Sequence, residues 1–306
     1  MYGYTYFGAE AKADVESIIL EVLDAYDARL AGADWLTEET REYARKKLAA
    51  ITIRAGYQDQ LDSWWYTLQI GDEKCAADAM LYLTVEKLMR QMSTAGQPVD
   101  RSQWGMSSNT VNACYDWSDN SINFPAAILQ EPFYSAGNSR EQNLGGIGMV
   151  IGHEISHAFD PQGSQYDAEG NKVNWWTDAD AEAFAERTAR VKERFNSIEV
   201  LPDEYVNGEM TIGEAVADLG GIAVTLDLMA KLENPDYDAY FRQLASVWKC
   251  RITKERASSD LRTNVHPLAF LRVDISVQQF DEFYATFDIE EGSAMYTAPE
   301  DRLKVW

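Results

Sequence analysis

Residues 153–157 read His-Glu-Ile-Ser-His, and their types and spacing suit metal-assisted hydrolysis. Positions four apart in a helix lie about 40° from each other around its axis, so the imidazoles of His153 and His157 can reach one zinc ion. Glu154 lies about 100° from His153, where its carboxylate can approach a water on the metal without ligating the metal. The pattern therefore predicts two nitrogen ligands and a nearby carboxylate that takes a proton from water.

A zinc site built on two histidines needs a third protein ligand. The candidates lie in the segment 211–221, where Glu214 and Asp218 are four apart and share a helix face. One carboxylate could ligate zinc while the other accepts the outer N–H of a ligating histidine. The spacing Thr211-x-x-Glu214 also fits a capping box, in which the glutamate only bonds the start of the helix. The spacing alone leaves both interpretations open.

Further positions could act on a substrate. His266 is the only other histidine of the chain, and an imidazole near zinc could stabilise the oxyanion of amide hydrolysis. Taken alone, a histidine without function is the favoured interpretation. Arg272 follows six residues later, and an arginine is more often an exposed, solvated side chain. Asn112 and Ala113 lie in a predicted strand whose exposed edge could pair with an extended peptide, although asparagine in a strand usually marks its end.

The elements that must position these residues are mostly helical. Apolar residues recur at three- and four-residue steps over 15–28, which predicts a helix with one buried face. Thr37 can cap a second helix, whose first-turn acids and last-turn bases at 45–47 suit the helix dipole. Further helices are predicted over about 73–92, 143–159, 178–196, 212–232, 237–250 and 277–286.

The predicted strands are few and short. They cover 110–115 and 121–124, joined by a turn at Asp119-Asn120, and a hairpin is expected around 167–171. The segment 97–103 is the best internal boundary.

Composition excludes several classes of protein. The chain has 306 residues with 50 acids against 27 bases, a net charge of −23 that would repel nucleic acid. No apolar run approaches the roughly 18 residues that span a membrane, and the first residues lack the pattern of a signal peptide. Three cysteines are too few for a disulfide framework. Localisation stays open, with the cytoplasm favoured.

Taken together, the motifs resemble the neprilysin and endothelin-converting-enzyme family of zinc metallopeptidases, with its bacterial members of the oligopeptidase O type. The resemblance runs from about residue 10 to the end. The segments that carry it are Val111-Asn-Ala, Phe124 to Gln130, Gly145 to Asp160, Asp167 to Trp176, Gly213 to Gly221, Val247-Trp248, Val265 to Arg272, and Val305-Trp306.

The resemblance implies a role for each matching position. His153, His157 and Glu214 would bind one zinc ion, with Asp218 supporting a zinc histidine. Glu154 would be the general base, and His266 would stabilise the oxyanion. Arg272 would bind a substrate carbonyl, and Asn112 with Ala113 would hold the peptide main chain. The hydrophobic S1′ pocket would comprise Ile128, Phe133, Met149, Val150, Val247 and Trp248. Without the resemblance, core packing is the default for this apolar set.

The resemblance also implies a fold and an activity. The expected fold is mainly α with a small β-sheet (α+β), a thermolysin-like zinc-peptidase (gluzincin) domain. Residues 1–100 would form the helical N-terminal part of the catalytic region and 101–306 the zinc-peptidase core. The expected reaction is hydrolysis of internal peptide bonds in peptides, on the amino side of bulky apolar residues.

Departures from the family pattern keep an alternative open. The chain matches only the C-terminal portion of the family, without the upstream domain that covers the cleft. It could therefore be a catalytically inert zinc-binding fragment or interaction module, self-associating through the face left uncovered. Leu303 and Lys249 stand where animal members carry cysteines, which fits a bacterial, disulfide-free member. Ala215 and Cys114 replace a common asparagine and tyrosine, and these changes bear on substrate affinity more than on zinc binding.

Overall fold

Contacts between residues divide the chain into two units. The structure, a computed structural model, describes residues 2–60, 63–69, 71 and 75–306. One unit combines Met1–Tyr57 with Met106–Trp306, and the other is Gln58–Gly105. The contacts thus place the first 57 residues with the C-terminal part. The predicted division of the family fold into 1–100 and 101–306 stays a prediction.

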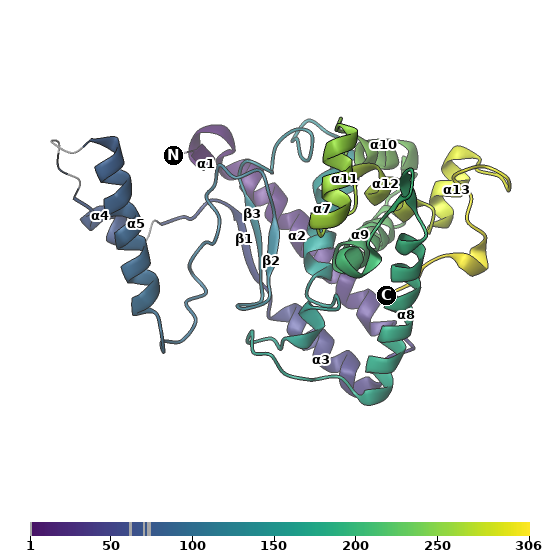
Figure 1. The fold of residues 1–306 in the computed structure, drawn as a ribbon, viewed down its shortest axis with the longest axis horizontal. Helices are drawn as coiled ribbons and strands as arrows, with labels where there is room; N and C mark the ends of the chain where they lie inside the picture. The colour runs from purple at the N-terminus through teal and green to yellow at the C-terminus, as the bar shows by residue number, and fades with distance from the viewer. Residues whose placement is uncertain (1, 61–62, 70, 72–74) are drawn as a thin grey trace. The chain divides into compact units, whose positions relative to one another are not determined.

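Helices dominate the larger unit and two small sheets complete it, which confirms the expected mainly α architecture (Figure 1). Its α-helices are α1 (Tyr2–Tyr6), α2 (Gly8–Ala31), α3 (Glu38–Ala49), α6 (Arg140–Asn143), α7 (Met149–Ser156), α8 (Asp178–Asn196), α9 (Gly208–Met229), α10 (Tyr237–Val247), α11 (Lys254–Thr263), α12 (Ala269–Val277) and α13 (Asp281–Phe287). Its strands are β1 (Thr52–Gly56), β2 (Cys114–Asp116), β3 (Ser121–Pro125), β4 (Glu199–Leu201) and β5 (Glu204–Tyr205). The short turns are a π-helical η1 (Leu144–Gly148) and the 3₁₀ turns η2 (Gly163–Gln165) and η3 (Pro299–Asp301).

Helices α7 and α9 lie side by side (Figure 1). They pack closely because glycines of the two helices face each other. A Cβ atom on Gly152 would lie 2.8 Å from the Cα of Gly221. A Cβ atom on Gly221 would lie 2.6 Å from the carbonyl oxygen of Met149 and 2.8 Å from the amide nitrogen of His153. These separations leave no room for a side chain, so the main chain of α7 rests directly on α9.

The segment that leads into α7 is a helix interrupted by a π-helical turn. The single helix expected over 143–159 is α6, η1 and α7 in sequence, and it ends at Ser156. Glycines allow other backbone segments to approach η1. A Cβ atom on Gly145 would lie 2.2 Å from the carbonyl oxygen of Tyr240, and one on Gly146 equally close to that of Phe133. The glycine-rich sequence therefore reflects close packing rather than a loop.

The larger sheet has the order β1-β3-β2, with β2 at an edge. Strand β1 pairs parallel to β3, and β2 pairs antiparallel to β3. Strand β1 was not predicted, because the charged residue Arg54 interrupts its apolar pattern. Arg54 is nevertheless buried, and a guanidinium nitrogen lies 2.6 Å from a carboxylate oxygen of Asp119. The strand expected over 110–115 begins only at Cys114.

Several predicted helix bounds were wrong. Helix α9 begins at Gly208 rather than near 212, because the side chain of Asn207 accepts a hydrogen bond from the main chain of Met210 and caps the helix there. The helix expected over 277–286 is α13, preceded by the unpredicted α12. Helix α11 was also missed, since it buries only Ala257 and Leu261 and has a weak apolar period. The helix expected over 178–196 is confirmed as α8.

The smaller unit contains α4 (Ser63–Thr67) and α5 (Ala76–Ser93). The prediction of a helix over 73–92 is confirmed at its C-terminal end, while its expected start at 73 lies outside the described residues. No residue of α5 is buried. Its large exposed apolar side chains are Met80, Leu81, Val85, Leu88, Met89 and Met92.

The helix crossing predicts the effect of one added methyl group. We expect Gly221→Ala to lower the free energy of unfolding by about 2–3 kcal/mol, because the new Cβ would meet main-chain atoms that cannot turn aside. Urea denaturation measures this change. Gly32→Ala is the matched control and should shift stability by less than about 1 kcal/mol, since its Cβ would meet its nearest atoms at 3.5 and 3.7 Å. Equal unfolding midpoints for wild type and Gly221→Ala would contradict this expectation, because they would show that α7 and α9 can move apart to admit the methyl group without loss of stability.

Candidate metal centre

Helix α7 presents two imidazoles to one point. The Nε2 atoms of His153 and His157 lie 3.1 Å apart, and the ring planes are inclined by 87°. Both side chains come from one helix face, as their four-residue spacing predicts. His153 is 4% exposed, so its ring is held by packing on all sides except toward the pocket.

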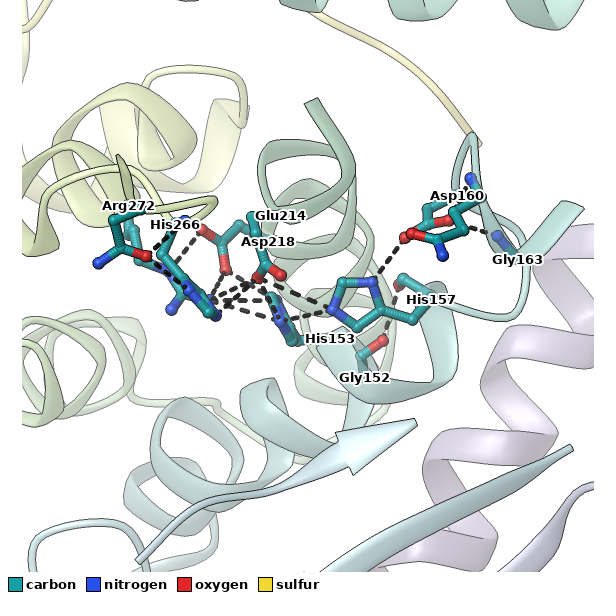
Figure 2. Close-up of polar contacts among 12 residues, drawn as sticks. Gly152, His153, His157, Asp160, Gly163, Glu214, Asp218, His266 and Arg272 are labelled. Atoms are coloured by element: carbon teal, nitrogen blue, oxygen red, sulfur yellow. Dashed lines mark hydrogen bonds and ion pairs between the residues drawn. The ribbon is translucent and has the colours of Figure 1, made fainter. Parts of the chain in front are cut away.

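Helix α9 contributes a carboxylate to the same point. The Oε2 atom of Glu214 lies 3.2 Å from Nε2 of His153 and 3.8 Å from Nε2 of His157 (Figure 2). This oxygen is buried and has no hydrogen-bond partner among the described residues. The capping-box interpretation is wrong, because Asn207 is the cap and Thr211 lies inside the helix, donating its hydroxyl to the carbonyl of Asn207. Glu214 is therefore free to face the histidines.

The donor set fits a transition-metal ion, and zinc in particular. One ligand atom from each of His153, His157 and Glu214 can be chosen so that all lie within 4.8 Å of one another. Two imidazole nitrogens and one carboxylate oxygen are a known ligand set for catalytic zinc, which keeps a fourth position open. A cation between them would also satisfy the buried Oε2 atom of Glu214, which otherwise carries a desolvation cost.

Asp218 and Arg272 form a buried pair behind His153. Asp218 is 1% exposed, and its carboxylate accepts hydrogen bonds at 2.6 and 2.9 Å from the guanidinium of Arg272. The same carboxylate lies 2.9 Å from Nδ1 of His153. Burial opposes the charge of Asp218, yet Arg272 and His153 hold the pKa of this carboxyl below its usual value. Arg272 also stacks on Trp248, 3.8 Å from the ring centre.

Asp160 plays the corresponding part for His157, although no role was predicted for it. Its Oδ2 atom lies 2.7 Å from Nδ1 of His157 (Figure 2). Its Oδ1 atom accepts hydrogen bonds from the main-chain N–H groups of Gln162 and Gly163, at 2.7 and 2.6 Å. A carboxylate three positions after the second histidine was the available signal, because a bend at the helix end can bring it to the outer nitrogen.

Burial and charge act against each other at His153 in the metal-free chain. Burial disfavours the imidazolium, but the neighbouring carboxylates of Asp218 and Glu214 raise the pKa of His153 to about 10. At Glu214, burial is likewise outweighed, and His153 leads the groups that hold the pKa of the carboxyl well below its usual range. The centre therefore stabilises positive charge beside Glu214.

His266 reaches the same carboxylate from the segment between α11 and α12. Its Nε2 atom lies 3.2 Å from Oε2 of Glu214 (Figure 2). The side chain of Asn264 contacts the other ring nitrogen at 3.1 Å. Burial lowers the pKa of His266 despite the nearby Glu214. The ring thus directs Nε2 toward Glu214 at the pocket.

A pocket of about 740 Å³ opens over this cluster. The predicted residues that line it are Asn112, Ala113, Ile128, Phe133, Val150, His153, Glu154, His157, Glu214, Trp248, His266 and Arg272. The pocket wall does not include Met149, which is fully buried in the core, or Val247; Asp218 lies beneath it. Unpredicted lining residues include Trp117, Asp160, Gln162, Met210 and Ile212.

Glu154 lines the pocket without joining the ligand cluster. It follows His153 on α7 and is 6% exposed. Its side chain therefore shares one pocket with the three candidate ligands, and its role as proton acceptor stays a prediction.

Family models match most of the chain. A model described as "Peptidase family M13" matches residues 112–303, and a second model with the same description matches residues 1–58. The chain belongs to peptidase family M13. This confirms the resemblance to the neprilysin and endothelin-converting-enzyme group, whose members are among its relatives.

M13 relatives are similar along the whole chain. The chain is 41% identical over 305 residues to "Neutral endopeptidase" of Lactococcus lactis subsp. lactis, covering 100% of this chain and 48% of the relative. It is 33% identical over 322 residues to "Endothelin-converting enzyme 1" of Bos taurus, covering 98% of this chain and 42% of the relative. The chain thus spans about half the length of the curated M13 relatives it matches.

Solved M13-type structures share the fold. The structure of PepO from Lactobacillus rhamnosis superposes with a TM-score of 0.93 at 40% identity, covering 100% of this chain and 48% of that one. The inhibitor complex of Mycobacterium tuberculosis zinc metalloprotease Zmp1 gives 0.89 at 33% identity, covering 99% of this chain and 49% of that one. These matches agree with the expected thermolysin-like gluzincin fold. Within the described ranges, no helix combines the length and apolarity needed to cross a bilayer.

The buried ion pair predicts a stability change that needs no metal. We expect Asp218→Asn to lower the free energy of unfolding of the metal-free chain by about 3–5 kcal/mol, because the buried guanidinium of Arg272 loses its counter-charge. Chemical denaturation in the presence of a chelator measures it.

The control for this change is Asp238→Asn, which removes a charge from the exposed pair with Arg242 in α10. It should cost about 0.5 kcal/mol or less. A cost below about 1 kcal/mol for Asp218→Asn would contradict the assigned pairing.

Proposed function

We propose that this chain carries the active site of a zinc metalloendopeptidase, an oligopeptidase that hydrolyses peptide bonds on the amino side of bulky apolar residues. The observation that carries the proposal is the convergence of His153, His157 and Glu214 within 4.8 Å, in a pocket that also holds Glu154. M13 membership and the zinc metalloprotease named among the similar structures support it.

His153, His157 and Glu214 would hold one zinc ion per chain. Bound there, zinc would act as a Lewis acid on the scissile carbonyl and lower the pKa of water toward about 7. Asp218 and Asp160 would accept the outer N–H groups of His153 and His157, fixing both tautomers with the inner nitrogens facing the pocket.

Glu154 would move the proton. It would take one proton from the attacking water and return it to the leaving amine, as a general base and then a general acid. Its burial at the pocket wall limits competition from bulk water.

His266 and Arg272 would stabilise charge that develops on the substrate. The imidazole of His266 enters the pocket beside Glu214, where a donor could meet the oxyanion. Loss of such a donor typically costs about 3 kcal/mol of transition-state stabilisation. Arg272 lines the pocket while its pair with Asp218 fixes the guanidinium in place, so it could bind a substrate carbonyl.

The peptide would lie against the edge of the sheet. Asn112 and Ala113 precede the edge strand β2 and line the pocket, so their polar groups could hold an extended main chain. The apolar wall would receive the side chain after the scissile bond. Its members would be Ile128, Phe133, Val150 and Trp248, whereas Met149 and Val247 do not line the pocket.

Zinc analysis and peptide cleavage test this proposal together. The chain should bind one zinc and cleave a quenched fluorescent peptide with phenylalanine after the scissile bond. A matched peptide with aspartate at that position should be cut more slowly, and chelation should stop cleavage. Absence of zinc binding would overturn the metal centre. Zinc binding with equal rates on both peptides would overturn the specificity alone.

The general base can be separated from the metal ligands by substitution. Glu154→Gln should reduce the rate of hydrolysis by at least about 10²-fold, because the amide cannot accept a proton. Zinc content should stay at the wild-type value, since Glu154 is not a ligand. Glu182→Gln, on α8, is the control and should keep full activity. Wild-type activity in Glu154→Gln would exclude the assigned base.

The third ligand has its own test. Glu214→Ala should weaken zinc binding by at least about 10²-fold, because one of three protein ligands is lost. Equilibrium competition with a chromogenic chelator measures the affinity. Glu209→Ala serves as the control, because Glu209 lies on the same helix and pairs with Lys192 instead. Unchanged affinity in Glu214→Ala would rule out ligation by this residue.

One surface supports the alternative of a zinc-binding module that self-associates. Helix α5 exposes an apolar series that includes Leu81, Val85 and Leu88, and large exposed apolar patches tend to pair. Light scattering of the zinc-loaded chain separates the alternatives. A stable dimer without peptidase activity would favour the module, whereas an active monomer would exclude it.

A further inference from the structure

A lysine ammonium lies inside the protein beside the candidate metal centre. Lys47, in the last turn of α3, is 0% exposed. A base in the last turn of a helix complements the helix dipole, and lysines are usually exposed to solvent. Instead, its Nζ atom donates hydrogen bonds of 2.7 Å to each of three main-chain carbonyl oxygens, those of Ala158, Gly163 and Tyr166. All three acceptors lie in the segment 158–166, which follows the second histidine.

The surroundings of Lys47 make this arrangement costly. The rings of Tyr115, Phe159 and Trp175 lie 6.0, 5.7 and 5.8 Å from the ammonium nitrogen, and their cation–π attraction offsets only part of the cost of taking the charge out of water. Burial lowers the pKa of Lys47 to about 7, although Asp160 and Asp167 favour its charged form. An apolar side chain of similar size would avoid the cost of desolvating the charge. What a lysine supplies here and an apolar side chain does not is the set of three hydrogen bonds to the segment 158–166.

These hydrogen bonds hold the loop that presents Asp160. Two of the acceptors, in Ala158 and Gly163, lie on either side of this residue in the sequence. The main-chain N–H of Gly163 donates to Asp160 while its carbonyl accepts from Lys47. Figure 2 shows Asp160 between Gly163 and His157, with interactions to both. A displacement of this loop would therefore displace the carboxylate that contacts His157.

We propose that Lys47 is a positioning residue for the metal centre, which acts by clamping the segment 158–166 so that Asp160 orients His157. The inference rests on the proposed function, because it requires that His157 bind a metal. Lys47 touches neither metal nor substrate in this scheme. Its contribution is transmitted through one peptide segment and one carboxylate.

Metal affinity tests the proposal directly. Lys47→Met keeps the length of the side chain and removes its three donors. We expect it to weaken zinc binding about 10-fold or more, since substitutions of groups that orient ligating histidines typically cost 10–100-fold. Competition with a chromogenic chelator gives the affinity. The visible spectrum of the Co(II)-substituted chain should shift, because the ligand geometry changes.

A matched control separates positioning from general stability. Arg302 is also buried, donates to the carbonyl of Thr297 and lies 4.0 Å from the ring centre of Tyr284. Arg302→Met should lower the melting temperature but leave the zinc affinity and the Co(II) spectrum unchanged. If both variants weaken zinc binding equally, Lys47 acts only through global stability and the proposal fails.

A double-mutant cycle tests the route through Asp160. Asp160→Asn should weaken zinc binding by itself, and adding Lys47→Met should then cause little further loss. Additive losses would show that Lys47 does not act through Asp160 and would overturn the proposal. If Lys47→Met does not fold, Lys47→Gln, which retains two N–H donors, enters the same cycle with the same expected non-additivity.

The outcomes distinguish this inference from the function it builds on. A wild-type chain that binds no zinc would refute the proposed metal centre itself. A wild-type chain that binds zinc, with Lys47→Met of equal affinity and spectrum, would refute only the role of Lys47.

Discussion

The contact between the main chains of α7 and α9 is the constraint on which the candidate centre depends. Two helices normally pack with their axes about 8–10 Å apart, separated by side chains. At Gly152 and Gly221 there is no side chain to separate them. One helix carries both histidines and the other carries Glu214, so their separation is set by backbone contact. The ligands can therefore converge without long or strained side-chain conformations.

Around this crossing, each imidazole has its own carboxylate, but the two carboxylates are stabilised differently. Asp218 is neutralised by the buried Arg272, whereas Asp160 is held by two main-chain N–H groups. Counted with Glu154 and Glu214, the centre gathers four carboxylates against the guanidinium of Arg272 and the ammonium of Lys47. This excess of negative charge in a mostly buried site attracts a divalent cation and explains why His153 and His157, unlike His266, have raised pKa values in the metal-free chain.

The parts of the centre that depend on local spacing could be predicted from the sequence. The four-residue separations of His153 from His157 and of Glu214 from Asp218 place each pair on one helix face, as the structure has them. Whether Glu214 is a metal ligand or part of a helix cap could not be predicted, because the answer depends on the residue at which α9 begins. The placement of Lys47 in the last turn of a helix is confirmed, but its burial could not be predicted, because it results from packing against a loop more than 100 residues away in the sequence.

The π-helical turn η1 sets the rotational phase of α7. Each residue advances an α-helix by about 100°, so a turn that accommodates one extra residue shifts everything after it by a similar angle. The glycines that pack η1 beneath Tyr240 and Phe133 fix this shift. The same sequence wound as a regular α-helix through 144–148 would keep the five-residue motif, but its imidazoles would point about a quarter-turn away from Glu214. In this protein the direction in which the two imidazoles of the motif point therefore depends on the irregular turn that precedes it.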